Sequence, residues 1–178
     1  SAAQVRDARH AYYAMISYCD DLLGRLVDTL QMLDVLDNTI LVVTSDHGDM
    51  LGERGLWYKM TFFDRAIRVP LVFAGPGIGT GKRIAAPVSH LDLLPTFADL
   101  CANPFTDLGS DGRSLFPSLT DGKEPVGNVV SEYMGEGYAQ PAVMIRRGNR
   151  KFTYARDDGA TLYDLAIDSV YWEREAPP

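Results

Sequence analysis

The hydrophobic positions near the start of the chain predict a long helix. Between residues 9 and 33 apolar side chains recur at steps of three and four, with Ser17, Asp20 and other polar residues between them. This spacing is typical of an amphipathic helix. We expect its apolar stripe to pack on a sheet, after a turn at Asp37 and Asn38. The stripe consists of Tyr12, Met15, Ile16, Cys19, Leu22, Leu23, Leu26, Val27, Leu30 and Leu33.

Two apolar runs without alternation predict buried strands. Residues 40–43 are rich in β-branched side chains, which is typical of a central strand in a parallel sheet. Residues 68–74 predict a second strand, entered through Pro70, and the glycine-rich residues 75–81 predict a surface connection. Ligands of open α/β sheets bind beyond the carboxyl ends of the strands, so the residues after position 43 are of most interest.

The following part of the chain predicts shorter elements. We expect a short strand at residues 82–86 and a helix at residues 93–101, with Ser89 as N-cap and Pro95 in the first turn. Capping also explains His90 and Asp92, which could otherwise be taken for a catalytic pair. Residues 103–125 are rich in glycine, proline, serine and aspartate and predict an irregular connection.

Short β-prone runs near the end predict a small antiparallel sheet. They cover residues 129–131, 143–145 and 151–154, and residues 146–150 form a plausible hairpin turn. We therefore expect two domains, an α/β body over residues 1–125 and a small antiparallel subdomain over residues 126–178.

Size, charge and cysteine content restrict the function classes. The chain has 178 residues, 46% of them hydrophobic, a net charge of −7 and a pI of about 4.9. This acidic balance argues against binding to nucleic acid or to an anionic membrane, and no apolar run approaches the length of a membrane span. Cys19 and Cys101 lie in apolar segments and predict buried free thiols. We expect the native start to precede Ser1, so the sequence does not tell whether the protein is exported. The expectation of a cytoplasmic location therefore rests on the two free cysteines alone, which favour a reducing compartment.

Asp46 and His47 stand where the first predicted strand ends. A carboxylate and an imidazole at a rigid strand end could bind one divalent cation, whereas Asp-His-Gly-Asp also suits a simple turn. Lys59 lies among bulky apolar neighbours, an unusual place for an ammonium group unless it faces an anion. The residues themselves leave both interpretations open.

The segment S-D-H-G-D-M-L-G-E-R-G-L-W-Y-K-M, residues 45–60, followed by R-V-P-L-V, resembles the sulfatase family of the alkaline-phosphatase superfamily, and within it the choline-sulfatase group. The resemblance extends to residues 9–26, 88–97 and 163–165. It implies the C-terminal part of an alkaline-phosphatase-like α/β sandwich, with a mostly parallel sheet and flanking helices, followed by the small antiparallel subdomain. It also implies that Asp46 and His47 are metal ligands and that Lys59 contacts the sulfate ester.

The resemblance implies a metal-dependent sulfuric ester hydrolase that converts choline sulfate to choline and sulfate. Its cofactors would be a divalent metal, with calcium preferred over magnesium or manganese, and a formylglycine nucleophile. Formylglycine arises in a Cys-x-Pro-x-Arg or Ser-x-Pro-x-Arg segment, and neither Cys19 nor Cys101 lies in one. We therefore expect the nucleophile in a missing N-terminal half, which would be a partner of this chain, and we expect the chain alone to be inactive. A homo-oligomer is a further expectation.

A pocket for choline would need aromatic faces and carboxylates, because a quaternary ammonium donates no hydrogen bonds. Residues 132–138 contain both, and we expect Glu136 and Tyr138 to bind substrate, with the resemblance favouring Glu136 as the carboxylate. A solvated acidic loop is the alternative interpretation. Arylsulfatase and phosphonate monoester hydrolase activities are alternatives for the enzyme, and a non-catalytic remnant domain is the alternative from another class.

Overall fold

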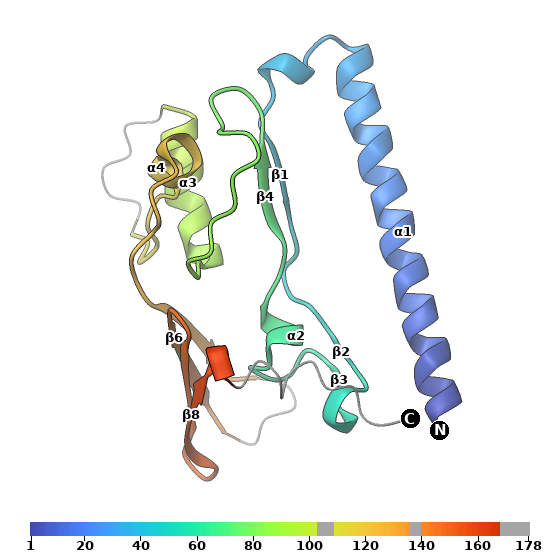
Figure 1. Ribbon diagram of the computed structural model, residues 1–178, viewed down its shortest axis with the longest axis vertical. Helices are drawn as coiled ribbons and strands as arrows, with labels where there is room; N and C mark the ends of the chain where they lie inside the picture. The colour runs from blue at the N-terminus through green and yellow to red at the C-terminus, as the bar shows by residue number, and fades with distance from the viewer. Residues whose placement is uncertain (103–108, 136–139, 168–178) are drawn as a thin grey trace. The chain divides into compact units, whose positions relative to one another are not determined.

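The computed structural model describes residues 1–102, 109–135 and 140–167, which are coloured in Figure 1. Contacts divide the chain into two compact units, one built by Ser1–Pro76 and the other beginning at Gly77. Both units contain helices and strands, and in the second unit the helices precede a four-stranded antiparallel sheet. The domain boundary expected after residue 125 stays a prediction.

The predicted long helix is present as α1 (Ala2–Met32), which begins before Arg9. A capping box starts it, because the Ser1 hydroxyl accepts from the backbone N–H of Gln4 while the Gln4 side chain accepts from the amino terminus. None of its residues is buried. The helix contacts the 3-10 helix η1 (Leu36–Asn38) and the strand β2 (Met50–Leu51), and the packing of its stripe on the sheet of residues 40–43 stays a prediction. Cys19 is exposed, as is Cys101, and the prediction of buried thiols was wrong.

The two predicted strands form an antiparallel pair. Strand β1 (Leu41–Thr44) pairs with β4 (Leu71–Ala74), and Leu41 lies opposite Ala74. The α/β class is confirmed. However, a parallel neighbour was expected for β1, and β4 runs antiparallel to it. Neither strand contains a buried residue, so the prediction of buried strands was wrong for this pair. An apolar run does not specify the direction of the next strand, and for this reason the pattern could not distinguish the two arrangements.

A small hairpin, residues 50–58, follows β1. It consists of β2 (Met50–Leu51), η2 (Glu53–Gly55) and β3 (Trp57–Tyr58), with Met50 opposite Tyr58. Met50 is 2% exposed, and Ala66 of the short helix α2 (Asp64–Ile67) is 1% exposed. These two side chains supply the buried anchor of the region that carries the motif.

The second unit begins with helices. Ser89 and Asp92 form the capping box of η3 (His90–Asp92), which continues into α3 (Leu93–Leu100), so the capping interpretation is confirmed for Ser89 and Asp92. Helix α4 (Phe116–Asp121) falls within the stretch that was predicted to be irregular. The strand predicted at residues 82–86 is absent. There the backbone N–H groups of Ala85 and Ala86 donate to the Glu124 carboxylate instead of to another strand.

The antiparallel sheet of the second unit has four strands in sequential order. They are β5 (Val129–Tyr133), β6 (Ala142–Arg147), β7 (Arg150–Ala155) and β8 (Gly159–Asp164). The predicted hairpin turn joins β6 to β7 through Gly148, whose φ is +53°. Strand β8 was not predicted. Among the described residues, no helix combines the length and the apolar composition needed to cross a bilayer.

Candidate functional site

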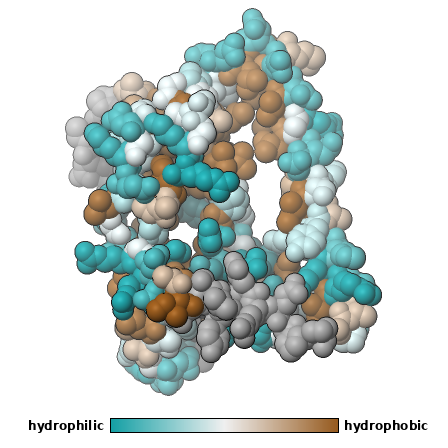
Figure 2. Space-filling model, viewed as in Figure 1, coloured by the Kyte–Doolittle hydropathy of each residue, from teal (hydrophilic) through white to brown (hydrophobic). Residues whose placement is uncertain are grey.

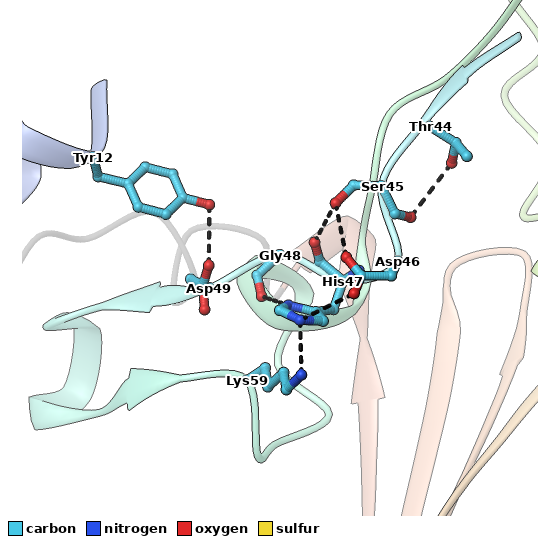
Figure 3. Close-up of polar contacts among 8 residues, drawn as sticks. All are labelled: Tyr12, Thr44, Ser45, Asp46, His47, Gly48, Asp49 and Lys59. Carbon is cyan, nitrogen blue, oxygen red and sulfur yellow. Dashed lines mark hydrogen bonds and ion pairs between the residues drawn. The ribbon is translucent and has the colours of Figure 1, made fainter. Parts of the chain in front are cut away.

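Asp46 and His47 lie in a tight turn directly after β1 (Figure 3). The Thr44 hydroxyl donates to the carbonyl oxygen of Pro70 at 2.9 Å and ties the end of β1 to the segment before β4. The Ser45 hydroxyl donates to the carbonyl oxygen of His47 at 2.7 Å, and Asp46 Oδ1 accepts from the backbone N–H of His47 at 2.9 Å. The turn interpretation is therefore correct for the backbone, and it leaves the Asp46 and His47 side chains side by side.

Gly48 allows this turn to lie directly against the backbone of α2. Its N–H donates to the carbonyl oxygen of Ala66 at 2.7 Å. A Cβ atom at this position would lie 2.1 Å from the carbonyl oxygen of Arg65, far inside van der Waals contact. Any side chain at position 48 would therefore displace the turn that carries the candidate ligands.

The ring of His47 is held in one tautomer. Its Nδ1 lies 2.8 Å from the carbonyl oxygen of Gly48, which can only accept a hydrogen bond, so in the neutral ring Nδ1 carries the proton. Nε2 then presents its lone pair, and Lys59 Nζ lies 2.8 Å from it (Figure 3). An imidazole arranged in this way can accept from an ammonium group or bind a metal ion through Nε2.

Asp46 adds a negative charge beside the same nitrogen. Its Oδ2 lies 3.4 Å from His47 Nε2, and the Asp46 side chain is 83% exposed against 32% for His47. The hydrogen bond from the backbone N–H of His47 lowers the pKa of the Asp46 carboxyl, so the group is ionised at neutral pH. One hard oxygen, one imidazole nitrogen and one ammonium group thus converge at the end of β1.

The donor set fits a divalent cation only in part. Asp46 and His47 offer two ligands whose atoms are close enough to share one ion, whereas calcium takes six to eight oxygen ligands. Within residues 1–102, 109–135 and 140–167 no group of three or more His, Cys, Asp or Glu side chains could hold a metal ion. The remaining ligands of such a site would have to come from elsewhere.

The structure brings Asp46, His47 and Lys59 together, as the resemblance implies. Glu136 and Tyr138, the other predicted site residues, lie outside the described residues. Asp49, from the same motif, turns toward α1 and accepts from the Tyr12 hydroxyl at 3.2 Å. Partial burial, followed by the Asp49 charge, raises the pKa of Tyr12.

Sequence analysis missed two residues of α1 that reach the motif, Arg9 and Tyr12. Both are half-buried, although they lie on a helix without any buried residue. Their spacing of three places them on one face of α1. That spacing was visible in the sequence, but nothing in it indicated that this face meets residues 49–53.

The sulfatase family model matches residues 2–103. The choline-sulfatase of Rhizobium meliloti (strain 1021) is 46% identical over 168 residues, and human arylsulfatase K is 32% identical over 177. Each alignment covers 93% of this chain, and the chain spans about a third of the relative (32% and 33%). The solved structure of BT4656 in complex with its substrate D-glucosamine-2-N,6-O-disulfate matches with a TM-score of 0.80 and 30% identity, over 89% of this chain and 34% of the other.

Proposed function

This chain belongs to the sulfatase family, and on that premise we propose that it is part of a sulfuric ester hydrolase that cleaves choline sulfate to choline and sulfate. The observation that carries the proposal is the pair of contacts at His47 Nε2, with Lys59 Nζ at 2.8 Å and Asp46 Oδ2 at 3.4 Å. The 46% identity to a choline-sulfatase supports the choice of substrate.

The chemistry of the reaction suits these side chains. A sulfate monoester carries one negative charge, and cleavage of its S–O bond places further charge on the leaving oxygen. The Lys59 ammonium would neutralise a non-bridging oxygen of the sulfate, which stabilises the transition state more than the ground state. Asp46 and His47 would hold a divalent cation, calcium by preference, which when bound polarises the ester.

The remaining parts of the site would come from the N-terminal half of the enzyme. That half would supply the formylglycine nucleophile and the other metal ligands. The apolar stripe of α1 supports this division, because Met15, Ile16 and Leu26 are 58%, 52% and 51% exposed. Figure 2 shows hydrophobic side chains at the surface along this helix. Packing of the N-terminal half on the stripe would cover them, and the 178-residue chain would be inactive without it.

Glu136 and Tyr138 are proposed for the choline group, since a fixed cation is met by carboxylates and aromatic faces and the resemblance favours Glu136 as the carboxylate. Arylsulfatase activity is the second candidate, favoured by the 32% identity to arylsulfatase K. The free thiols of Cys19 and Cys101 support a reducing compartment such as the cytoplasm.

A chimera tests the proposal. In it, this chain replaces the matching third of the Rhizobium meliloti choline-sulfatase, which supplies the rest of the enzyme. We expect turnover of choline sulfate by the chimera and none by the chain alone. Lys59→Ala should lower kcat by about a hundredfold to a thousandfold, the scale for removing one preorganised group that meets transition-state charge. Lys59→Arg should restore little of the lost kcat, because a planar guanidinium group does not replace a compact ammonium group.

The matched control is Lys123→Ala, because the Lys123 side chain is 71% exposed and pairs with the nearby Asp121 at the surface. A fully active Lys59→Ala chimera would exclude Lys59 from the site. For the choline pocket, Glu136→Gln should raise KM for choline sulfate more than for a neutral aryl sulfate. Equal changes for the two substrates would remove Glu136 from the pocket and favour the arylsulfatase alternative.

A further inference from the structure

An ion pair joins α1 to the hairpin, residues 50–58. Arg9 Nη2 lies 3.4 Å from Glu53 Oε1, and the two side chains are only 23% and 18% exposed. Arg9 Nε also donates to the carbonyl oxygen of Leu51 at 3.0 Å, while Glu53 Oε2 accepts from the backbone N–H of Leu51 at 2.6 Å. An ion pair shielded from solvent to this extent stabilises the fold more than an exposed surface pair does.

The two side chains of the ion pair bind both backbone polar groups of Leu51, its C=O and its N–H. In an antiparallel ribbon the residues bonded to the partner strand alternate along each strand. Since the N–H of Gly52 donates to the carbonyl oxygen of Leu56, the N–H and C=O of Leu51 face away from β3. Arg9 and Glu53 satisfy them there. We call this arrangement, Arg9 and Glu53 around the backbone of Leu51, the clamp.

The hairpin sets the position of Lys59. Lys59 directly follows β3, and Tyr58 before it has a φ of +68°, which is unfavourable for a residue with a side chain. Such a conformation persists only where the surrounding structure holds it. Two strand pairings hold it here, namely Tyr58 with the buried Met50 and Trp57 with Leu51, the residue held by the clamp.

A second contact from α1 reaches the other side of the motif. The Tyr12 hydroxyl, one helical turn after Arg9, donates to Asp49 Oδ2 at 3.2 Å, and Asp49 lies between the His47 turn and Met50. The first turns of α1 therefore hold the chain at residues 49, 51 and 53, between the turn that carries His47 and the strand that leads to Lys59.

We propose that Arg9, acting through Glu53 and the backbone of Leu51, is a positioning residue that keeps Lys59 Nζ at the His47 edge of the site. The inference rests on the proposed function, in which Lys59 meets the sulfate. Arg9 holds Leu51 and Glu53 of the hairpin, so its effect on turnover would pass through the hairpin to Lys59.

The test uses the same chimera. Arg9→Ala should lower kcat by about tenfold to a hundredfold, the scale for a small misplacement of a catalytic group, with little change in KM. In a Lys59→Ala background the same substitution should change kcat by less than about twofold, because the group that Arg9 positions is already gone. Arg9→Lys keeps the charge but lacks the branched guanidinium group that reaches both Leu51 and Glu53. Its kcat should therefore lie between those of Arg9→Ala and the wild type.

Arg6→Ala is the matched control. Arg6 lies one turn earlier on α1, and its pair with Asp7 is long, at 4.0 Å, and 70% and 72% exposed. Hydrogen exchange followed by mass spectrometry gives a readout without turnover. The peptide covering residues 49–59 should exchange faster in Arg9→Ala than in Arg6→Ala or the wild type.

Two results would overturn the inference, namely an equal fold-loss of kcat for Arg9→Ala in the wild-type and Lys59→Ala backgrounds, or unchanged exchange of the hairpin peptide. An inactive wild-type chimera would instead overturn the proposed function. The exchange measurement would then still decide whether Arg9 orders the hairpin.

Discussion

The contact between His47 Nδ1 and the carbonyl oxygen of Gly48 decides how the site can work, because it directs the Nε2 lone pair away from the backbone. The Lys59 ammonium lies 2.8 Å from that lone pair, where a cation bound to His47 would also have to lie. A metal ion proposed for this site would therefore compete with Lys59 for the same nitrogen. Its binding would displace Lys59 Nζ from His47.

Metal affinity of the chain alone tests this competition. We expect calcium to bind with a Kd weaker than about 0.1 mM, because two ligands leave the ion far short of its usual coordination. Lys59→Met should tighten binding by about twofold to tenfold, since it removes a positive charge a few ångströms from the ion. Calorimetric titration measures both, with Lys123→Met as the control. Submicromolar affinity would mean that further ligands, Asp49 and Glu53 first among them, turn toward the ion.

At the scale of elements, the turn after β1 depends on its contact with α2. Gly48 donates to Ala66 across an interface that has no room for a side chain. Ala66 itself is buried, so α2 cannot easily move outward. The candidate ligands thus derive their position from two elements, β1 before them and α2 beside them.

Substitution of this glycine should destabilise the fold. Gly48→Ala places a Cβ 2.1 Å from the carbonyl oxygen of Arg65, and we expect a loss of about 2 kcal/mol or more in the free energy of unfolding. Gly24→Ala is the control, because Gly24 lies in α1 with nothing within 4 Å of an added Cβ. It should stabilise the protein by about 0.5 to 1 kcal/mol. Denaturant unfolding measures both changes, and an unchanged midpoint for Gly48→Ala would show that α2 yields to the side chain.

At the scale of the whole molecule, the first turns of the helix α1 differ from its later turns. Arg9 and Tyr12 reach the motif, whereas the apolar stripe further along has no buried residue. The chain spans about a third of its curated relatives (32% and 33%), and we propose that the remaining part of the enzyme covers this stripe. The same helix would then connect the positioning of Lys59 to the assembly of the complete site.

A charged side chain in the apolar stripe should lower stability substantially only in the complete enzyme. Leu22 is 42% exposed in this chain, so Leu22→Asp should cost little stability there. In the chimera it should cost about 2 to 4 kcal/mol, because the charge would be buried against the N-terminal half. Ser17→Asp, on the polar face, should have little effect in either protein. Equal effects of Leu22→Asp on the thermal unfolding of both proteins would show that the stripe stays exposed.

The sequence by itself determined the elements whose signal is local. The three- and four-residue spacing of apolar side chains predicted α1, and the runs at residues 40–43 and 68–74 predicted β1 and β4. Ser89 with Asp92 predicted the start of η3, because a cap needs only residues close in the chain. The resemblance of residues 45–60 to the sulfatase family indicated Asp46, His47 and Lys59 as candidate site residues, and their roles stay a prediction.

Only the tertiary structure decided which elements meet. The antiparallel pairing of β1 with β4 and the clamp between Arg9 and Glu53 join residues far apart in the chain. Neither follows from periodicity, which reports that a face is apolar and not what lies against it. The strand predicted at residues 82–86 was wrong for the same reason, because Glu124 takes the N–H groups that a neighbouring strand would have needed. Local propensity acts over a few residues, whereas the contacts of Gly48, Lys59 and Arg9 depend on where distant backbone is placed.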